Sequence, residues 1–244
     1  LLGYLFGAGL LAVGFKLKKK YANYSAVLVS GAMAIMYFLT YIAYSFYELF
    51  PQTVAFGFMV LLTVFTVVAA LNYQLQVIAL IGLVGAYAVP FLLSTGSGQF
   101  AILFSYMALI NGGILIISVK KFWRLLHYAA FVFTWLIFGT WYETYYNFSH
   151  LYLAGGFLIL FFLTFYATFL AHKIWQRQQF TGADIAAFLI NAFIFYGFGF
   201  DLLSFKLATS AYLGLFTLAN ALVHFGVSAI IYYRKQADKN LFYL

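Results

Sequence analysis

Residues 151–171 read LYLAGGFLILFFLTFYATFLA, a run of 21 residues without a charged side chain. A helix needs about 20 mainly apolar residues to cross the hydrocarbon core of a bilayer, so this run predicts a membrane-spanning helix. The whole chain shares the bias: 66% of its 244 residues are hydrophobic, and 13 basic plus 5 acidic residues give 18 charges. A soluble chain of this length would carry roughly 61. This composition excludes a soluble globular domain.

Apolar runs of this kind recur along the chain. Cutting the sequence where charged or turn-forming residues cluster gives nine segments. They are residues 1–15, 24–47, 52–71, 76–93, 100–119, 125–142, 151–171, 184–203 and 208–233. The weakest cut is the uncharged polar stretch 72–76, but joining its flanks would give about 40 residues, too long for one crossing. The runs are continuous rather than alternating, which excludes a membrane β-barrel. We predict an all-α, polytopic transmembrane helical bundle that forms a single domain over residues 1–244.

The first segment is short for a crossing and starts with Leu1 rather than Met. We therefore expect the chain to be a fragment of a longer protein whose first helix begins upstream. A cleaved signal peptide is the alternative, but it needs a basic leading region, and residues 1–4 have none.

The basic residues predict the orientation. Nine crossings leave loops on alternate sides, and one set of loops holds twelve of the thirteen Lys and Arg residues. These are Lys16, Lys18, Lys19, Lys20, Lys120, Lys121, Arg124, Lys173, Arg177, Arg234, Lys235 and Lys239. The positive-inside rule then places the amino terminus outside and the carboxyl terminus in the cytoplasm, in the bacterial inner membrane. The net charge of +8 thus indicates membrane lipids, with other membrane subunits as further partners, rather than nucleic acid.

Four polar residues lie inside the predicted crossings. They are Asn111, Asn191, Asn220 and His224. Asn220 and His224 share one helical face because they are four residues apart. Ionisable and amide groups are rare at this depth, so we hypothesise that the four line a path for a substrate or for protons. The alternative is that each forms a hydrogen bond that holds two helices together.

A second candidate is a tyrosine stripe on the second segment. Tyr37, Tyr41, Tyr44 and Glu48 follow spacings of 4, 3 and 4 and so share a face. With Asp201, they could form an outer groove for a headgroup, a sugar or a cation. The alternative is the aromatic belt that tyrosines form at membrane interfaces, although Tyr37 lies too deep for it.

Two local patterns predict structure rather than chemistry. Gly3, Gly7 and Gly14 fall on a similar face of the first segment and indicate close helix packing. Thr181 and Asp184 have the spacing of a capping box that opens the eighth segment.

Catalytic motifs of soluble enzymes do not occur in this sequence. It has no phosphate-binding glycine loop before a lysine, no zinc-protease motif and no nucleophile elbow. There is no cysteine, and the four histidines are far apart in sequence. We therefore predict no catalytic residue, no metal site and no cofactor.

Three stretches in the first half of the chain carry a family resemblance. They are GAMAIMY at residues 31–37, YIAY at residues 41–44 and GLVGAYAVPFLLSTG at residues 82–96. Over about residues 24–143 the chain resembles the bacterial family of predicted membrane proteins named domain of unknown function 2339. Members of that family are long multi-pass proteins with a charged cytoplasmic amino-terminal region. The resemblance implies no activity and therefore no catalytic residue.

Three functions remain open from the sequence. We expect transport or flipping of a small or lipid-linked cell-envelope molecule, because polar residues lie inside the crossings. One alternative is a membrane-embedded sensor or assembly scaffold of a larger protein, in which those residues serve packing. The second alternative is an outer-face transferase that uses the acidic residues of the outer loops as a general base.

Overall fold

The computed structural model describes residues 2–74, 76–92, 98, 100–121, 123–176, 180–204 and 211–233. The regular elements within these residues are all helices. They are α1 (Leu2–Leu17), α2 (Ala22–Ser45), α3 (Gln52–Tyr73), α4 (Gln76–Leu92), α5 (Phe100–Lys120), α6 (Arg124–Tyr145), the 3₁₀ helix η1 (Phe148–His150), α7 (Leu151–Gln176), α8 (Gly182–Ser204) and α10 (Leu213–Tyr233).

Each of the nine predicted segments coincides with one α-helix, so the all-α prediction is confirmed for the described residues. Six helices are long and apolar enough to cross a membrane, namely α2, α3, α5, α6, α7 and α8. The described parts of α1, α4 and α10 are shorter apolar helices. The predicted orientation of the termini stays a prediction.

Two helix boundaries are informative. The cut at residues 72–76 is confirmed, because α3 ends at Tyr73 and Gln74 adopts a left-handed conformation with φ of 56°. A left-handed residue is a common helix terminator. The seventh segment is longer than predicted, since α7 continues to Gln176 and places Lys173 in its last turn.

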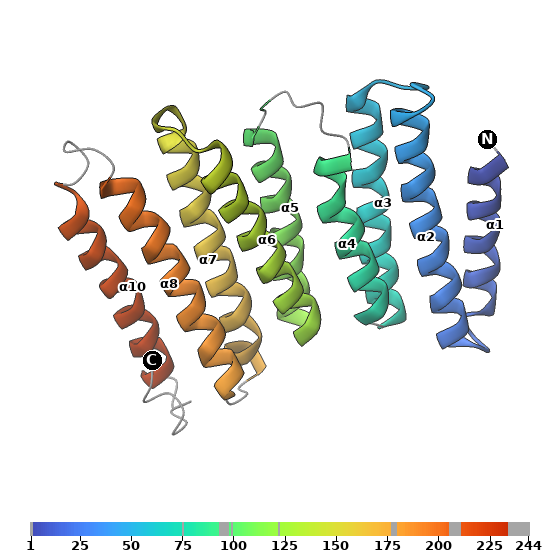
Figure 1. Cartoon of the computed structure of the whole chain (residues 1–244). Helices are drawn as coiled ribbons and strands as arrows, with labels where there is room; N and C mark the ends of the chain where they lie inside the picture. The colour runs from blue at the N-terminus through green and yellow to red at the C-terminus, as the bar shows by residue number, and fades with distance from the viewer. Residues whose placement is uncertain are drawn as a thin grey trace. The chain divides into compact units, whose positions relative to one another are not determined.

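The helices group into two compact units, each described here by itself. Unit 1 comprises Leu1–Leu103 and Trp123–Ala130, and unit 2 comprises Phe104–Phe122 and Phe131–Leu244. In unit 1, α2 packs against α1, α3 and α4, and α3 also packs against α4 (Figure 1). In unit 2, α8 packs against α7 and α10 (Figure 1). The prediction of a single domain stays a prediction.

Small residues hold the helices of unit 1 together. A Cβ atom added to Gly14 of α1 would lie 2.8 Å from Val29 Cγ2 of α2, and one added to Gly3 would lie 2.8 Å from Leu39 Cδ1. At both positions a larger residue would require the neighbouring side chain to move, so the predicted close packing of α1 is confirmed. Most of the other fully buried side chains of this unit are also small, for example Ala32 and Ala55.

Phenylalanine rings fill the core of unit 2. Phe138 of α6 lies at the centre, with ring centroids 5.6 Å from Phe104, 6.2 Å from Phe161 and 5.3 Å from Phe198. Most of these pairs are edge-to-face or tilted, the arrangements that aromatic rings prefer. Large apolar side chains also cover the outside of this unit, including Phe193 and Phe225, which are each 73% exposed. Such a surface suits lipid rather than water.

Candidate functional site

The four polar residues predicted to line a path lie near the middle of their helices. His224 is the twelfth of the 21 residues of α10, which spans about 31 Å at a rise of about 1.5 Å per residue. Asn191 is the tenth of 23 residues in α8, and Asn111 is the twelfth of 21 in α5. The structure thus keeps them away from both helix ends.

Asn191 connects three helices. Its Oδ1 accepts a hydrogen bond from Trp135 Nε1 of α6 (3.2 Å), and its Nδ2 donates to the carbonyl oxygen of Phe162 of α7 (3.1 Å). The side chain is fully buried in the structure. Both ends of the amide are therefore used by helix packing.

Asn111 makes a similar contact between two helices. Its Nδ2 donates to Thr134 Oγ1 of α6 at 3.0 Å, and both residues are buried. The alternative that we kept for the asparagines, that they connect helices, describes both Asn111 and Asn191 in this structure.

His224 differs, because it is half-buried and its neighbour on the same face has an unused acceptor. His224 Nδ1 forms a hydrogen bond of 2.8 Å with the hydroxyl of Tyr166 of α7. One turn earlier, Asn220 Oδ1 is buried and has no hydrogen-bond partner among the described residues. A buried amide oxygen one turn from a histidine can accept a hydrogen bond from a polar group.

Phe162 of α7 contacts both Asn191 of α8 and His224 of α10. Its carbonyl oxygen accepts from Asn191, and its ring centroid lies 6.4 Å from that of His224. Asn111 instead faces Thr134. Asn191 and His224 thus both contact Phe162 of α7, Asn220 lies one turn before His224 in α10, and Asn111 lies at the α5–α6 contact.

The tyrosine stripe of α2 divides into two parts. Tyr37 is buried, its hydroxyl is hydrogen-bonded to Thr63 Oγ1 of α3, and a Cβ added to Gly85 of α4 would lie 3.1 Å from its ring. Tyr37 thus belongs to the core of unit 1. Tyr41 and Tyr44 are half-buried and Glu48 is exposed. Asp201, the fifth residue of the predicted groove, belongs to unit 2, and the groove stays a prediction.

Asp201 has partners that the sequence analysis did not foresee. The Tyr142 hydroxyl of α6 donates to Asp201 Oδ2 at 2.6 Å, and the Tyr142 ring stacks on Tyr146 with centroids 4.5 Å apart. Burial and the nearby Asp201 carboxylate raise the pKa of Tyr146 above its usual value. A carboxylate among tyrosines at a helix end can accept hydrogen bonds from a polar ligand. The transferase alternative stays a prediction.

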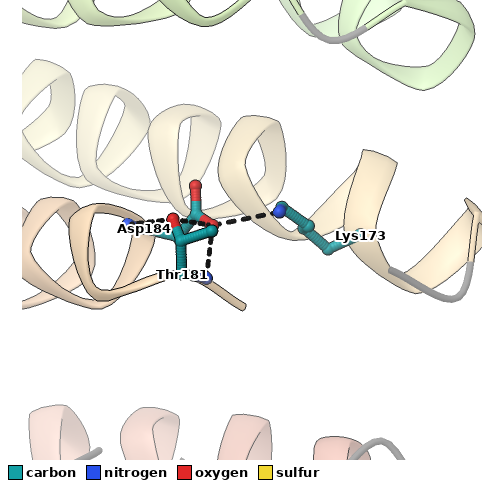
Figure 2. A network of polar contacts seen from close by, with 3 residues as sticks. All are labelled: Lys173, Thr181 and Asp184. Carbon is teal, nitrogen blue, oxygen red and sulfur yellow. Dashed lines mark hydrogen bonds and ion pairs between the residues drawn. The ribbon is translucent and has the colours of Figure 1, made fainter. Parts of the chain in front are cut away.

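A buried ion pair joins the ends of α7 and α8. Lys173 Nζ lies 3.0 Å from Asp184 Oδ2, and the two side chains are 3% and 1% exposed. The same oxygen accepts hydrogen bonds from the backbone N–H and the hydroxyl of Thr181 (Figure 2). The Asp184 N–H donates back to Thr181 Oγ1 at 3.4 Å, which confirms the predicted capping box. Asp184 Oδ1 is buried without a partner among the described residues.

The sequence analysis missed the residues that complete these contacts, namely Thr134, Trp135, Tyr166 and Lys173. Of these four, only the contact of Lys173 with Asp184 could have been predicted from the sequence, because few residues separate the end of α7 from the start of α8. Within the described residues, no three His, Asp or Glu side chains lie close enough to hold a metal ion.

Comparison with known proteins identifies the family. One protein-family model, described as "Predicted membrane protein (DUF2339)", matches residues 1–241. No curated protein and no solved structure matches the chain. The match extends well beyond residues 24–143, where the resemblance was apparent, and the membrane-spanning helices agree with its description. The chain is a multi-pass membrane protein that belongs to the DUF2339 family of predicted membrane proteins.

Proposed function

We propose that this protein transports or flips a small or lipid-linked envelope molecule across the bacterial inner membrane. The observation that carries the proposal is the site made by Tyr166, Asn220 and His224, here called the α7–α10 site. It combines a titratable imidazole, a tyrosine hydroxyl that bonds the imidazole, and the buried amide oxygen of Asn220 one turn away. Polar groups at this depth in a membrane protein are typical of substrate and proton pathways.

The attachment of α10 also supports a transport function. Over residues 213–229 of α10, every side chain is half-buried or exposed. Phe216 fixes it near its start, stacked on Tyr196 with centroids 5.7 Å apart and pressed onto Gly199 of α8. Further along α10, the hydrogen bond between His224 and Tyr166 connects the helix to α7. A helix with few buried contacts opens at low free energy, so α10 can move and expose the α7–α10 site.

Proteoliposomes provide the test. Purified protein is reconstituted into vesicles that hold the pH dye pyranine and a trace of fluorescent phosphatidylglycerol, and proton entry and dithionite-accessible lipid are followed. We expect the wild-type protein to accelerate at least one process, and His224→Gln to slow that process by about tenfold or more, which corresponds to about 1.4 kcal/mol.

His150→Gln is the matched control, because His150 lies in η1, outside α10, and should leave the rate unchanged. Tyr166→Phe keeps the ring but removes the hydroxyl that bonds His224, and it should slow the process as well. Wild-type protein that accelerates neither process would refute transport, and full activity of His224→Gln and Tyr166→Phe would refute the site.

A membrane-embedded scaffold is the second candidate. It is favoured by Asn191, whose amide oxygen bonds Trp135 of α6 and whose amide nitrogen bonds the Phe162 carbonyl of α7. For a scaffold, substitutions at the α7–α10 site would change stability alone, without a transport phenotype. A vesicle assay that is silent for the wild-type protein, together with copurifying membrane subunits, would support this candidate instead.

A further inference from the structure

Four lysines gather at the turn between α1 and α2. Lys16, Lys18, Lys19 and Lys20, here called the lysine hairpin, fall within five residues. Lys16, Lys19 and Lys20 are exposed and Lys18 is half-buried. The backbone N–H of Tyr21 donates to the carbonyl of Leu17 at 2.8 Å and closes the turn. Four positive charges are thus concentrated on a short, hydrogen-bonded turn.

Contacts with two other helices hold the lysine hairpin in place. The Ser25 hydroxyl of α2 donates to the carbonyl oxygen of Gly14 and is 2.7 Å from the hydroxyl of Tyr73 at the end of α3. Lys18 Nζ lies 4.6 Å from the centre of the Tyr73 ring, within the range of a cation–π contact. The turn and the Lys18 ammonium are therefore held on unit 1 before any ligand arrives.

The lysine hairpin has no acidic residue near it in unit 1. Its lysines form no ion pair within the described residues. The first acidic residue of the chain is Glu48, beyond the far end of α2, and the next is Glu143. The 24 residues of α2 separate the hairpin from Glu48 by about 36 Å. This is several times the Debye length of about 8 Å at physiological ionic strength.

The residues next to the lysine hairpin indicate which anion neutralises its positive charge. Tyr21 and Tyr24, at the start of α2, are 52% and 59% exposed, and α2 continues from them as an apolar span. Tyrosines at the end of a membrane helix lie at headgroup depth. The lysines next to them therefore lie at the level of lipid phosphates.

We propose that the lysine hairpin binds the phosphate of an anionic phospholipid headgroup, with Lys18 and Tyr73 as the fixed part of the site and Lys19 and Lys20 as its exposed part. Clusters of four or more basic residues beside a membrane helix recognise anionic lipids in this way. This proposal does not depend on the transport function.

The test measures which lipid stays with the protein. The protein is reconstituted into nanodiscs of phosphatidylglycerol and phosphatidylcholine in equal amounts, and retained lipid is identified by native mass spectrometry. We expect the wild-type protein to retain phosphatidylglycerol preferentially. The variant with Lys19→Gln and Lys20→Gln should reduce that preference by about tenfold.

The matched control carries Lys121→Gln and Arg124→Gln, which remove the same charge at the turn before α6. It should keep the preference, whereas Lys18→Gln should weaken it. Equal losses in both double variants would mean diffuse attraction, and an unchanged preference in the hairpin variant would exclude the site. Either outcome overturns the proposal. Thermal stabilisation of detergent-solubilised protein by inorganic phosphate as strong as that by phosphatidylglycerol would also overturn it, because the ligand would then be a free anion.

Discussion

Units 1 and 2 are both built from apolar helices, yet they pack by opposite means. The eight phenylalanines among the largest fully buried side chains, from Phe104 to Phe188, all belong to unit 2. Unit 1 instead packs glycine, alanine and hydroxyl residues, and its largest fully buried side chains are Met33, Met59 and Ile78. Water provides no driving force between helices in lipid, so packing and hydrogen bonds must hold both units.

The two units also differ in the length of their buried polar side chains. In unit 1 the buried polar groups are mostly short hydroxyl side chains: Thr40 donates to the carbonyl of Met36 in its own helix and lies 2.9 Å from the hydroxyl of Tyr4 of α1. In unit 2 longer polar side chains connect helices, as Asn191 does with α6 and α7 and Lys173 with Asp184 of α8. Of the two proposed sites, the α7–α10 site lies in unit 2 and the lysine hairpin in unit 1.

The largest effect is expected where unit 2 buries charge. Asp184→Asn leaves the Lys173 ammonium buried without its counter-charge, and breaking a buried pair in this way costs about 3 to 5 kcal/mol. Adding Lys173→Met should recover most of that loss, because no unpaired charge remains. The free energy of unfolding in bicelles, measured by steric trapping, tests both. A double variant as unstable as the single one would show that the capping box, rather than the charge pair, is what matters.

A smaller but clear effect is expected from filling the close contact in unit 1. Gly14→Leu forces α1 away from Val29 of α2, and overpacking of this kind costs about 1 to 3 kcal/mol. Gly9→Leu on the same helix is the matched control, since a Cβ there meets nothing within 4 Å. Thermal unfolding in detergent should separate the two variants. Equal melting temperatures would mean that α1 does not depend on small-residue packing.

The sequence predicted much of the fold, because the bilayer imposes a length and a composition on every crossing. All nine segments were placed, and even the uncharged cut near Gln74 was correct. The glycine face of α1 was also predictable, since close packing depends only on spacing along one helix.

The candidate site was predictable only in part. The sequence identified Asn191 and His224 as unusual at their depth, but their partners Trp135 and Tyr166 depend on how neighbouring helices are rotated. No pattern within one helix fixes that rotation. Tyr37 shows the same limit, because a tyrosine that lines a groove and one that contacts Gly85 and Thr63 have the same spacing along the helix.

The smallest effect concerns the tyrosines beside Asp201, at the edge of the aromatic packing of unit 2. Burial and the Asp201 carboxylate raise the pKa of Tyr146, because both disfavour a phenolate. Asp201→Asn removes the second cause, so the pKa of Tyr146 should fall part of the way toward its ordinary value of about 10. The pKa of Tyr146 is measured by following the carbon-13 resonances of labelled tyrosine with pH, and the Tyr146 signal is assigned as the one missing from Tyr146→Phe.

The sign of the accompanying stability change follows from proton linkage. When folding raises the pKa of a group, that group stabilises the folded protein fully at pH values below its pKa in the unfolded chain. The stabilisation is lost as the pH rises through the pKa of the group in the folded protein. The wild-type protein should therefore lose stability above about pH 10, and Asp201→Asn should lose less. Glu143→Gln removes an equal charge one residue from Tyr142 and should leave the Tyr146 pKa in place, since burial and Asp201 are what raise it. A Tyr146 pKa that falls equally in Glu143→Gln would mean that general charge at this end of unit 2, rather than Asp201 itself, acts on the ring.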